Sequence, residues 1–335
     1  MGRTADTLRS GRVTRPPRRP ARGPGSRSLV ASLAGPVAIV AGTLVILNGF
    51  VFRGLINVAD TLQAWLPTYC FLGRALRAGH IPAWNPFLLG GTPFAADPQS
   101  GWLYAPAMAL FTILPCSVAI RMMVAFHPLL AGLALYWFLR SEGMSRPVAS
   151  AGGLVISLGM SGAELVESFP FAGTLAWMPV LLACASRYMR ASRPSSRVLW
   201  ALLTALAWGQ LAGAHFSVGL LMGTMALIGF LLAKVFSGAG RLRWSAPRGL
   251  LLAGVLVAAL PLVNLAFLLP RLAYTPQTDL GLGYAKLNEL GARLVGQRPL
   301  RFAPGQANAP PWALLLAASP GAHLGAVALV LSFAG

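Results

Sequence analysis

Residues 198–235 read VLWALLTALAWGQLAGAHFSVGLLMGTMALIGFLLAKV, one continuous apolar stretch with a single charged residue near its end. Roughly 20 residues of α-helix cross the hydrocarbon core of a bilayer, so this stretch is long enough for two spans. We divide it at the polar residue His215. The stretch therefore predicts two membrane helices, and two glycine pairs have the spacing of closely packed membrane helices: Gly209/Gly213 and Gly219/Gly223.

The rest of the chain repeats this pattern. It is 56% hydrophobic and 10% charged, with a mean hydropathy of +0.66. Backbone polar groups in hydrocarbon need internal partners, which helices provide, and the short alternating segments of a membrane β-barrel are not found. The sequence predicts an all-α, polytopic helical membrane protein with about 7–8 transmembrane helices. They come from apolar runs at about 29–52, 117–139, 148–166, 171–187, 198–214, 215–235, 249–270 and 312–334.

The basic residues are distributed as topology signals. The net charge is +19, but most cations lie in the N-terminal tail or in short loops between apolar runs, which argues against a nucleic-acid-binding face. Loops 140–147, 187–197 and 234–248 are rich in arginine and lysine, and most acids fall in the alternate loops. Cytoplasmic loops are enriched in basic residues. We therefore expect a multi-pass protein of the cell membrane with these loops and the N-terminus in the cytoplasm.

The chain divides into a tail and a membrane domain. Residues 1–28 are rich in Arg, Pro, Gly and Ser and are expected to be a disordered cytoplasmic tail. Residues 29–335 form the transmembrane domain. Its first run, 29–52, is too long for a signal-peptide core and is interpreted as a signal-anchor helix. The last run reaches Gly335 without a polar tail, so we expect the chain to be the N-terminal part of a longer protein.

Segment 53–116 is then a long first extracytoplasmic loop. Residues 61–78 have apolar side chains at helical spacing and predict a helix. The proline-rich part, 81–101, predicts a loop. Residues 103–114 are apolar but too short to span, which suits an interfacial or re-entrant segment.

The three cysteines show neither a CxxC motif nor zinc-ligand spacing. Cys70 and Cys116 fall on the same side of the membrane, so a disulfide between them can form. Cys184 fits a small apolar residue inside a helix.

Several polar residues of the first outer loop can carry chemistry. Asp60 lies just outside the membrane, where a carboxylate can take a proton from an acceptor hydroxyl or hold a divalent metal ion; alternatively it caps the next helix. Trp84 can stack on a sugar ring or belong to the aromatic belt at the membrane interface. Asn85, Asp97 and Gln99 can hydrogen-bond a polar substrate or satisfy the backbone of their own turns.

Four residues outside this loop are further candidates. Glu164 and Glu167 lie one turn apart at the outer end of a membrane run, as functional acids or as side chains that snorkel to the surface. His215 lies at an outer turn, although a lone histidine is more often structural. Arg271 can bind a phosphate through charge-assisted hydrogen bonds or anchor its helix at the headgroups. The sequence contains no P-loop, GxSxG or HExxH motif.

The chain resembles the bacterial YfhO-like membrane proteins, most specifically between Asp60 and Tyr104. The motifs that carry the resemblance are Asp60-x-x-Gln63-x-x-x-Pro67, Pro82-x-Trp84-Asn85-Pro86, Gly90-Gly91-x-Pro93, Ala96-Asp97-Pro98-Gln99-Ser100-Gly101 with Tyr104, Ala176-Trp177-Met178-Pro179 and Pro270-Arg271. The resemblance covers roughly residues 35–335.

That family resembles the multi-span GT-C glycosyltransferases, which use polyprenyl-phosphate-linked sugars on the outer face of the membrane. The resemblance implies a GT-C-like fold and makes Asp60 the catalytic base or an acceptor-orienting group. It makes Asp97, Glu164 and Glu167 secondary candidates, and Gln63 a substrate-binding residue. The expected partners are membrane lipid and the lipid-linked sugar.

Three functions remain open on the sequence. The first is transfer of a sugar from a polyprenyl-phosphate donor to a cell-envelope acceptor. The second is transport of a lipid-linked sugar, which predicts paired acids or interrupted helices at mid-membrane depth. The third is a non-catalytic role in envelope assembly. The acids cluster at the outer edge, which favours the first.

Overall fold

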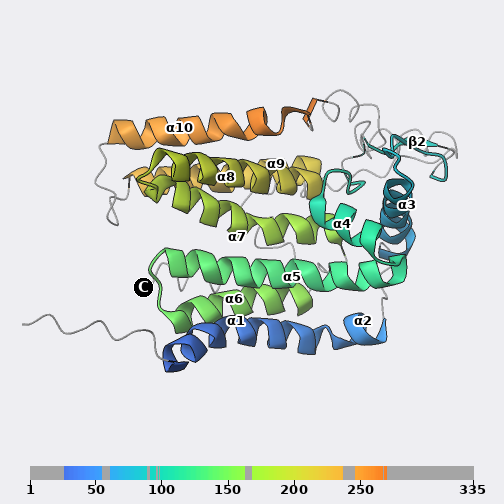
Figure 1. Ribbon diagram of the computed structural model, residues 1–335, viewed down its shortest axis with the longest axis horizontal. Helices are drawn as coiled ribbons and strands as arrows, with labels where there is room; N and C mark the ends of the chain where they lie inside the picture. Colours follow the sequence, from blue (N-terminus) through green and yellow to red (C-terminus); the bar gives the residue numbers. More distant parts are fainter. Residues whose placement is uncertain are drawn as a thin grey trace, which may run out of the picture.

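The computed structural model describes residues 26–54, 61–88, 91–95, 97, 99–162, 168–236, 246–266 and 268–269. The regular secondary structure of this part of the chain is helical except for one ladder of two-residue strands (Figure 1). Its elements, in order, are α1 Ser26–Ile46, α2 Asn48–Arg53, the π-helical turn η1 Thr61–Trp65, α3 Leu66–Arg77, β1 Trp84–Asn85, β2 Thr92–Pro93, α4 Ala105–Ile113, α5 Cys116–Ser141, α6 Arg146–Gly162, α7 Phe169–Arg190, α8 Pro194–Ala214, α9 Phe216–Phe236 and α10 Ala246–Val263.

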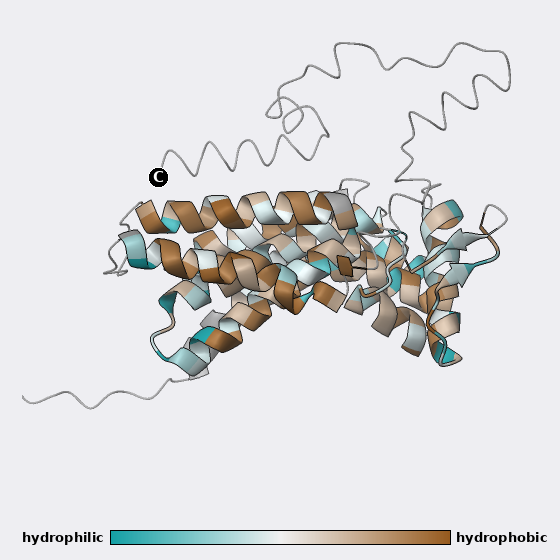
Figure 2. Cartoon of the chain, turned by 90° about the horizontal axis from the view of Figure 1, so that it is seen from above, coloured by the Kyte–Doolittle hydropathy of each residue, from teal (hydrophilic) through white to brown (hydrophobic). Residues whose placement is uncertain are grey.

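Three of the described helices are long and apolar enough to cross a membrane: α5, α7 and Val218–Phe236 of α9. They coincide with three of the expected runs and indicate a multi-pass membrane protein. The long helices lie side by side (Figure 1), with hydrophobic residues along their length and strongly hydrophilic ones mainly near their ends (Figure 2). Helices α5 and α7 are mostly buried, whereas α9 exposes apolar side chains such as Leu221 and Met225.

Prolines begin several helices. Proline occupies one of the first two positions of α3, α4, α7 and α8. The first N–H groups of a helix have no intrahelical partner, so a residue without an N–H costs little there. At the other end, α2 and α5 stop where Gly54 and Gly143 adopt a positive φ, a conformation that glycine tolerates. These prolines and glycines mark where the helices begin and end through local backbone preferences.

The division of residues 198–235 is confirmed: α8 ends at Ala214, and α9 begins at Phe216 after His215. The prediction of a single anchor helix over 29–52 is wrong in one respect. It is interrupted at Leu47, where α1 gives way to α2, and the Asn48 amide donates a hydrogen bond to the Val45 carbonyl at this break. Residues 26–28, expected in the tail, already belong to α1, whereas the earlier tail and the run at 312–334 lie outside the described residues.

Small residues let the helices approach closely. A Cβ on Gly132 of α5 would lie 2.8 Å from the Gly153 carbonyl of α6 and 2.7 Å from the side chain of Ile39 of α1. Thr43 of α1 hydrogen-bonds Ser157 of α6 close to this crossing. Close helix packing is confirmed for the pair Gly219/Gly223, where a Cβ would press on Leu211 of α8. A Cβ on Gly209 would press on Asn264, just after α10, and one on Gly213 would lie 3.0 Å from the Leu103 carbonyl, which lies in the turn before α4 and not in a helix.

The described residues between 61 and 115 form what we call the cap, over one end of the bundle (Figure 1). In Figure 1 α3 lies across the ends of the long helices, next to α4. The expected helix over 61–78 is confirmed as η1 and α3, and the 103–114 segment contains the nine-residue α4. The expected loop over 81–101 contains the antiparallel ladder that pairs Trp84 with Pro93.

A disulfide fastens the cap to the bundle, and a set of hydrogen bonds joins two helices of the cap. A disulfide joins Cys70 of α3 to Cys116, the first residue of α5, while Cys184 is free and buried. The guanidinium of Arg77 donates to three carbonyls at the end of α4, namely those of Phe111 (2.8 Å), Thr112 and Leu114. These carbonyls have no partner within their own helix, so Arg77 acts as a C-terminal cap from another element. The disulfide thereby ties the cap to α5, and Arg77 joins α3 to α4 within the cap.

Candidate functional site

Six of the ten candidate residues lie in the described part of the chain. They are Gln63, Trp84, Asn85, Asp97, Gln99 and His215. Asp60, Glu164, Glu167 and Arg271 lie outside it, so their roles stay predictions.

The structure brings Gln99 and His215 together. The Gln99 side-chain amide nitrogen lies 3.1 Å from Nε2 of His215, although 116 residues separate them in sequence. An amide nitrogen donates, so in this arrangement Nε2 accepts and the ring proton lies on Nδ1. His215 is 6% exposed, and Phe171 lies edge-on against its ring. Burial lowers the pKa of His215, which makes the neutral ring the dominant form at pH 7.

Asp97 builds the turn that presents Gln99. Its carboxylate accepts a hydrogen bond from the backbone N–H of Gln99 at 2.7 Å, and its carbonyl accepts from the Ser100 hydroxyl at 3.0 Å. This is the local side chain-to-backbone pattern that favours Asp in turns. Asn85 does the same at the hairpin: it is 5% exposed, and its side-chain oxygen accepts from the N–H of Phe87. Both residues therefore satisfy the backbone of their own turns, which was the alternative to substrate binding.

The segment that follows this turn is held by α8 through a second polar residue. The Gln210 side-chain oxygen accepts from the N–H of Ala105 at 2.8 Å, and its amide group donates to the Leu103 carbonyl. Gly213 makes room for this contact, because a Cβ there would lie 3.0 Å from the same carbonyl. Gln210, Gly213 and His215 all lie at the end of α8. The end of α8 therefore holds residues 99–105 in place.

Next to the contacts that α8 makes with residues 103–105, Tyr104, His127 and Trp177 form a buried polar cluster. The Tyr104 hydroxyl is 2.8 Å from Nε2 of His127 in α5 and accepts a 3.2 Å hydrogen bond from the Trp177 indole in α7. Tyr104 is fully buried, and burial raises its pKa well above the ordinary value, so the phenol stays protonated. The sequence reasoning did not select this cluster as a site. Two of its members, Tyr104 and Trp177, belong to the motifs that carry the family resemblance, and His127 is, with Arg121, an unusual polar residue in the run at 117–139.

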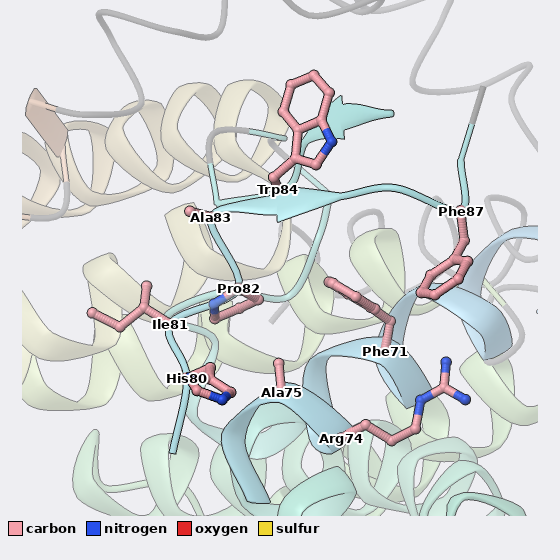
Figure 3. Close-up of a pocket in the computed structure, with 9 residues that line it drawn as sticks. All are labelled: Phe71, Arg74, Ala75, His80, Ile81, Pro82, Ala83, Trp84 and Phe87. Carbon is pink, nitrogen blue, oxygen red and sulfur yellow. The ribbon is translucent and has the colours of Figure 1, made fainter. Parts of the chain in front are cut away.

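The cap also forms an open cavity of about 660 Å³ (Figure 3). Its lining combines the aromatic rings of Phe71, Phe87 and Trp84 with the cationic Arg74 and with His80. Phe71, Arg74 and Ala75 come from α3, and in Figure 3 the Trp84 ring extends from β1 away from them. Such a mixture of flat apolar faces and a guanidinium suits a ligand that carries both a ring and an anionic group.

Trp84 is positioned by Gly91. A Cβ on Gly91 would lie 2.5 Å from the indole of Trp84. Gly91 also has φ +120°, a backbone conformation that residues other than glycine rarely adopt. Trp84 is 55% exposed, so much of its ring remains accessible to a ligand. Gln63 lies exposed on η1. Of the candidates, Trp84 lines the cavity, whereas Gln99 and His215 form a separate pair.

Metal ligands are a separate question. The described residues contain no group of three or more His, Cys, Asp or Glu side chains that could hold a metal ion. Asp60, the residue for which a metal was considered, lies outside them. Neither protein-family models, nor curated proteins, nor solved structures contain a match to this chain, so its site is interpreted from its own residues.

Proposed function

We propose that the protein is a GT-C-like glycosyltransferase of the bacterial plasma membrane, with the cap on the outer face. It would transfer a sugar from a polyprenyl-phosphate donor to a cell-envelope acceptor. The observation that carries this proposal is the cavity of the cap, where aromatic rings and Arg74 lie together in the segment that resembles the YfhO-like proteins. A lipid-linked sugar phosphate offers a ring for the aromatic faces and a phosphate for the guanidinium.

Two further observations support this orientation. Among the described residues, eight basic side chains lie at or beyond the helix ends opposite the cap, at what we call the arginine end: Arg140, Arg146, Arg187, Arg190, Arg193, Arg197, Lys234 and Arg248. Basic residues of this kind remain on the cytoplasmic side. The cap carries the Cys70–Cys116 disulfide, and disulfides persist in oxidising compartments outside the cytosol.

The proposed reaction is a substitution at the anomeric carbon. The acceptor hydroxyl oxygen forms a bond to that carbon, and the bond from the carbon to the phosphate oxygen breaks. The polyprenyl phosphate leaves with the electron pair, and the hydroxyl proton passes to the Asp60 carboxylate. Arg74 would stabilise the charge that develops on the leaving phosphate, and Trp84 would orient the sugar.

Transport of a lipid-linked sugar receives less support. It predicts paired acids or interrupted helices at mid-membrane depth, and the one break described above, at Leu47, lies near the end of the run 29–52 and not at its middle. Among the described residues, Asp97 and Glu142 lie in connections outside the long helices, and those helices contain no acid. A non-catalytic assembly role is distinguished by the experiment below.

The test uses the full-length gene in its host. Cell-envelope glycans are compared between wild type, a deletion strain and strains carrying Asp60→Asn, Arg74→Gln or Trp84→Ala at equal expression. We expect Asp60→Asn to match the deletion, with partial loss for the other two. Asp6→Asn in the tail is the matched acid-to-amide control and should behave as wild type. If Asp60→Asn restores the glycans fully, the catalytic assignment is wrong; if the deletion itself leaves the glycans unchanged, the glycosyltransferase proposal is wrong.

A further inference from the structure

A second cavity, of about 530 Å³, lies at the arginine end of the bundle. Its lining includes Arg140 from α5, Arg187 and Arg190 from α7, and Arg193, which immediately precedes α8. We propose that this cavity binds a phosphate group, supplied either by the headgroup of an anionic phospholipid or by a soluble phosphate compound. The proposal is independent of the sugar transfer suggested for the cap.

The charges around this cavity are unbalanced. Glu142 is the acid next to it, and Arg190 (2.8 Å) and Lys234 both form ion pairs with that carboxylate. Its other oxygen accepts a hydrogen bond from Ser186. Within the part of the chain that the structure describes, Arg140, Arg187 and Arg193 form no ion pair with a carboxylate. Three arginine charges therefore remain uncompensated at the cavity.

Glu142 remains ionised beside these cations. Burial raises the pKa of its carboxyl. Hydrogen bonds from Lys234 and Ser186 and the charges of Lys234 and Arg190 lower that pKa by more, so the net pKa is below the ordinary value. Its negative charge is directed to Arg190 and Lys234. Even with this charge counted, the cavity attracts anions.

Arg187 is held ready for a ligand by two aromatic rings. The centre of its guanidinium lies 5.5 Å from the ring of Trp137 and 5.8 Å from that of Trp200, and Trp200 also lines the cavity. Cation–π contacts of this kind fix the plane of a guanidinium. The Nε–H of Arg187 is buried and has no hydrogen-bond acceptor among the described residues. Because this Nε–H is covered by protein atoms, a ligand in the cavity would bind the terminal N–H groups of the guanidinium instead.

The other arginines keep donors for the same ligand. Arg140 donates to the Met144 carbonyl and Arg190 to that of Ser141, but each guanidinium has five N–H groups. Two parallel bonds from one planar guanidinium match two oxygens of a phosphate, a fixed geometry that a lysine ammonium does not provide.

The start of α8 adds a favourable dipole. Arg193 is its N-cap residue and makes no side-chain cap hydrogen bond, the first turn contains no acid, and Ser196 of that turn lines the cavity. Unpaired N–H groups at a helix N-terminus favour an anion. This contribution accompanies the arginines and does not stand alone.

Two measurements on the purified full chain test the proposal and separate the two sources of phosphate. In the first, inorganic phosphate is titrated onto protein in neutral detergent and binding is followed by calorimetry. In the second, the protein is reconstituted with phosphatidylglycerol and phosphatidylcholine, and lipid retained after extraction into detergent is identified by native mass spectrometry.

The variants are the double substitution Arg140→Gln/Arg193→Gln and the single substitution Arg187→Lys. The control is Arg146→Gln, which removes an exposed arginine at the same end but outside the cavity. We expect the double variant to weaken binding of the relevant probe at least tenfold, since charge-assisted hydrogen bonds are the strong ones. Arg187→Lys should weaken it severalfold although the charge is kept, and Arg146→Gln should leave it unchanged. Helix content and thermal unfolding of each variant verify that it folds.

Each outcome decides the proposal. Saturable phosphate binding that depends on these arginines identifies a soluble phosphate compound as the ligand class. Retention of phosphatidylglycerol over phosphatidylcholine with the same dependence, without phosphate binding, identifies a lipid headgroup. Absence of both, or an equal loss in Arg146→Gln, overturns the proposal. If the double variant does not fold, Arg193→Gln alone replaces it, because Arg193 is exposed.

Discussion

The Gln99 amide nitrogen and Nε2 of His215 lie 3.1 Å apart and join the cap to the turn between α8 and α9. We expect Gln99→Ala to lower the free energy of unfolding by about 1 kcal/mol, the usual contribution of one hydrogen bond. Thermal unfolding in detergent measures this. Gln63→Ala, a change of the same kind at an exposed position, should leave the free energy of unfolding unchanged. An equal loss of stability in both variants would show that the hydrogen bond between Gln99 and His215 does not stabilise the fold.

The same pair predicts a pH dependence. Burial lowers the pKa of His215, so below the unfolded-state value of about 6.5 the unfolded chain binds a proton that the folded protein does not. The stability that neutral His215 contributes is therefore present above pH 6.5 and is lost as the pH falls below it toward the folded-state pKa. Unfolding of wild type and His215→Gln is compared between pH 7.5 and 5. The variant should lose less stability on acidification, and identical pH profiles would contradict this.

Tyr104 connects two helices through its hydroxyl group. In Tyr104→Phe the Trp177 indole and Nε2 of His127 would lose their observed partner in a buried place, which should cost about 1–3 kcal/mol. A double-mutant cycle with His127→Leu provides the control. Because both single changes break the same contact, the double variant should be less destabilised than the sum of the two. Strict additivity would show that the two residues act independently.

Crowded and open glycines should respond oppositely to the same change. In Gly153→Ala the new Cβ would lie 2.7 Å from the Gly132 carbonyl, so we expect destabilisation of about 1–3 kcal/mol. In the part of the chain that the structure describes, no atom outside the backbone of α9 itself lies within 4 Å of such a Cβ at Gly229. Gly229→Ala should therefore stabilise the helix by up to about 1 kcal/mol. Thermal unfolding of both variants checks the sign as well as the size.

The disulfide between Cys70 and Cys116 closes a loop with a sequence separation of 46 residues. Cys70→Ser/Cys116→Ser should lower stability by about 2–4 kcal/mol, because the cross-link restricts the unfolded chain. Adding reductant should lower the unfolding temperature of wild type but not that of the double variant. Cys184→Ala removes the free buried thiol and should keep the wild-type response to reductant.

The proposed orientation can be tested with cysteine labels at the two ends of the bundle. Ala78→Cys follows α3 in the cap and Ser145→Cys lies between α5 and α6; both positions are exposed. Each is placed in a Cys184→Ala background and treated in intact cells with a membrane-impermeant maleimide. We expect Ala78→Cys to react at once and Ser145→Cys only after permeabilisation. The reverse pattern would contradict an outward-facing cap.

The helices themselves were predictable because hydropathy and length are local properties. The apolar run from 198 to 235 and its polar interruption at His215 predicted α8 and α9, and the run at 117–139 predicted α5. The break of the first run at Leu47 was missed because the run was interpreted by its overall apolar length, although the local signal for a break, Asn48-Gly49, follows directly.

The contacts around the cap depend on tertiary structure. The sequence alone determined that Gln99 and His215 were unusual polar residues in an apolar chain, and that Cys70 and Cys116 could meet. That Gln99 reaches His215, that Tyr104 reaches His127 and Trp177, and that four arginines line one cavity was decided by how the helices pack. Such contacts join residues far apart in the chain, and local hydrophobic patterns carry no information about which helix ends become neighbours.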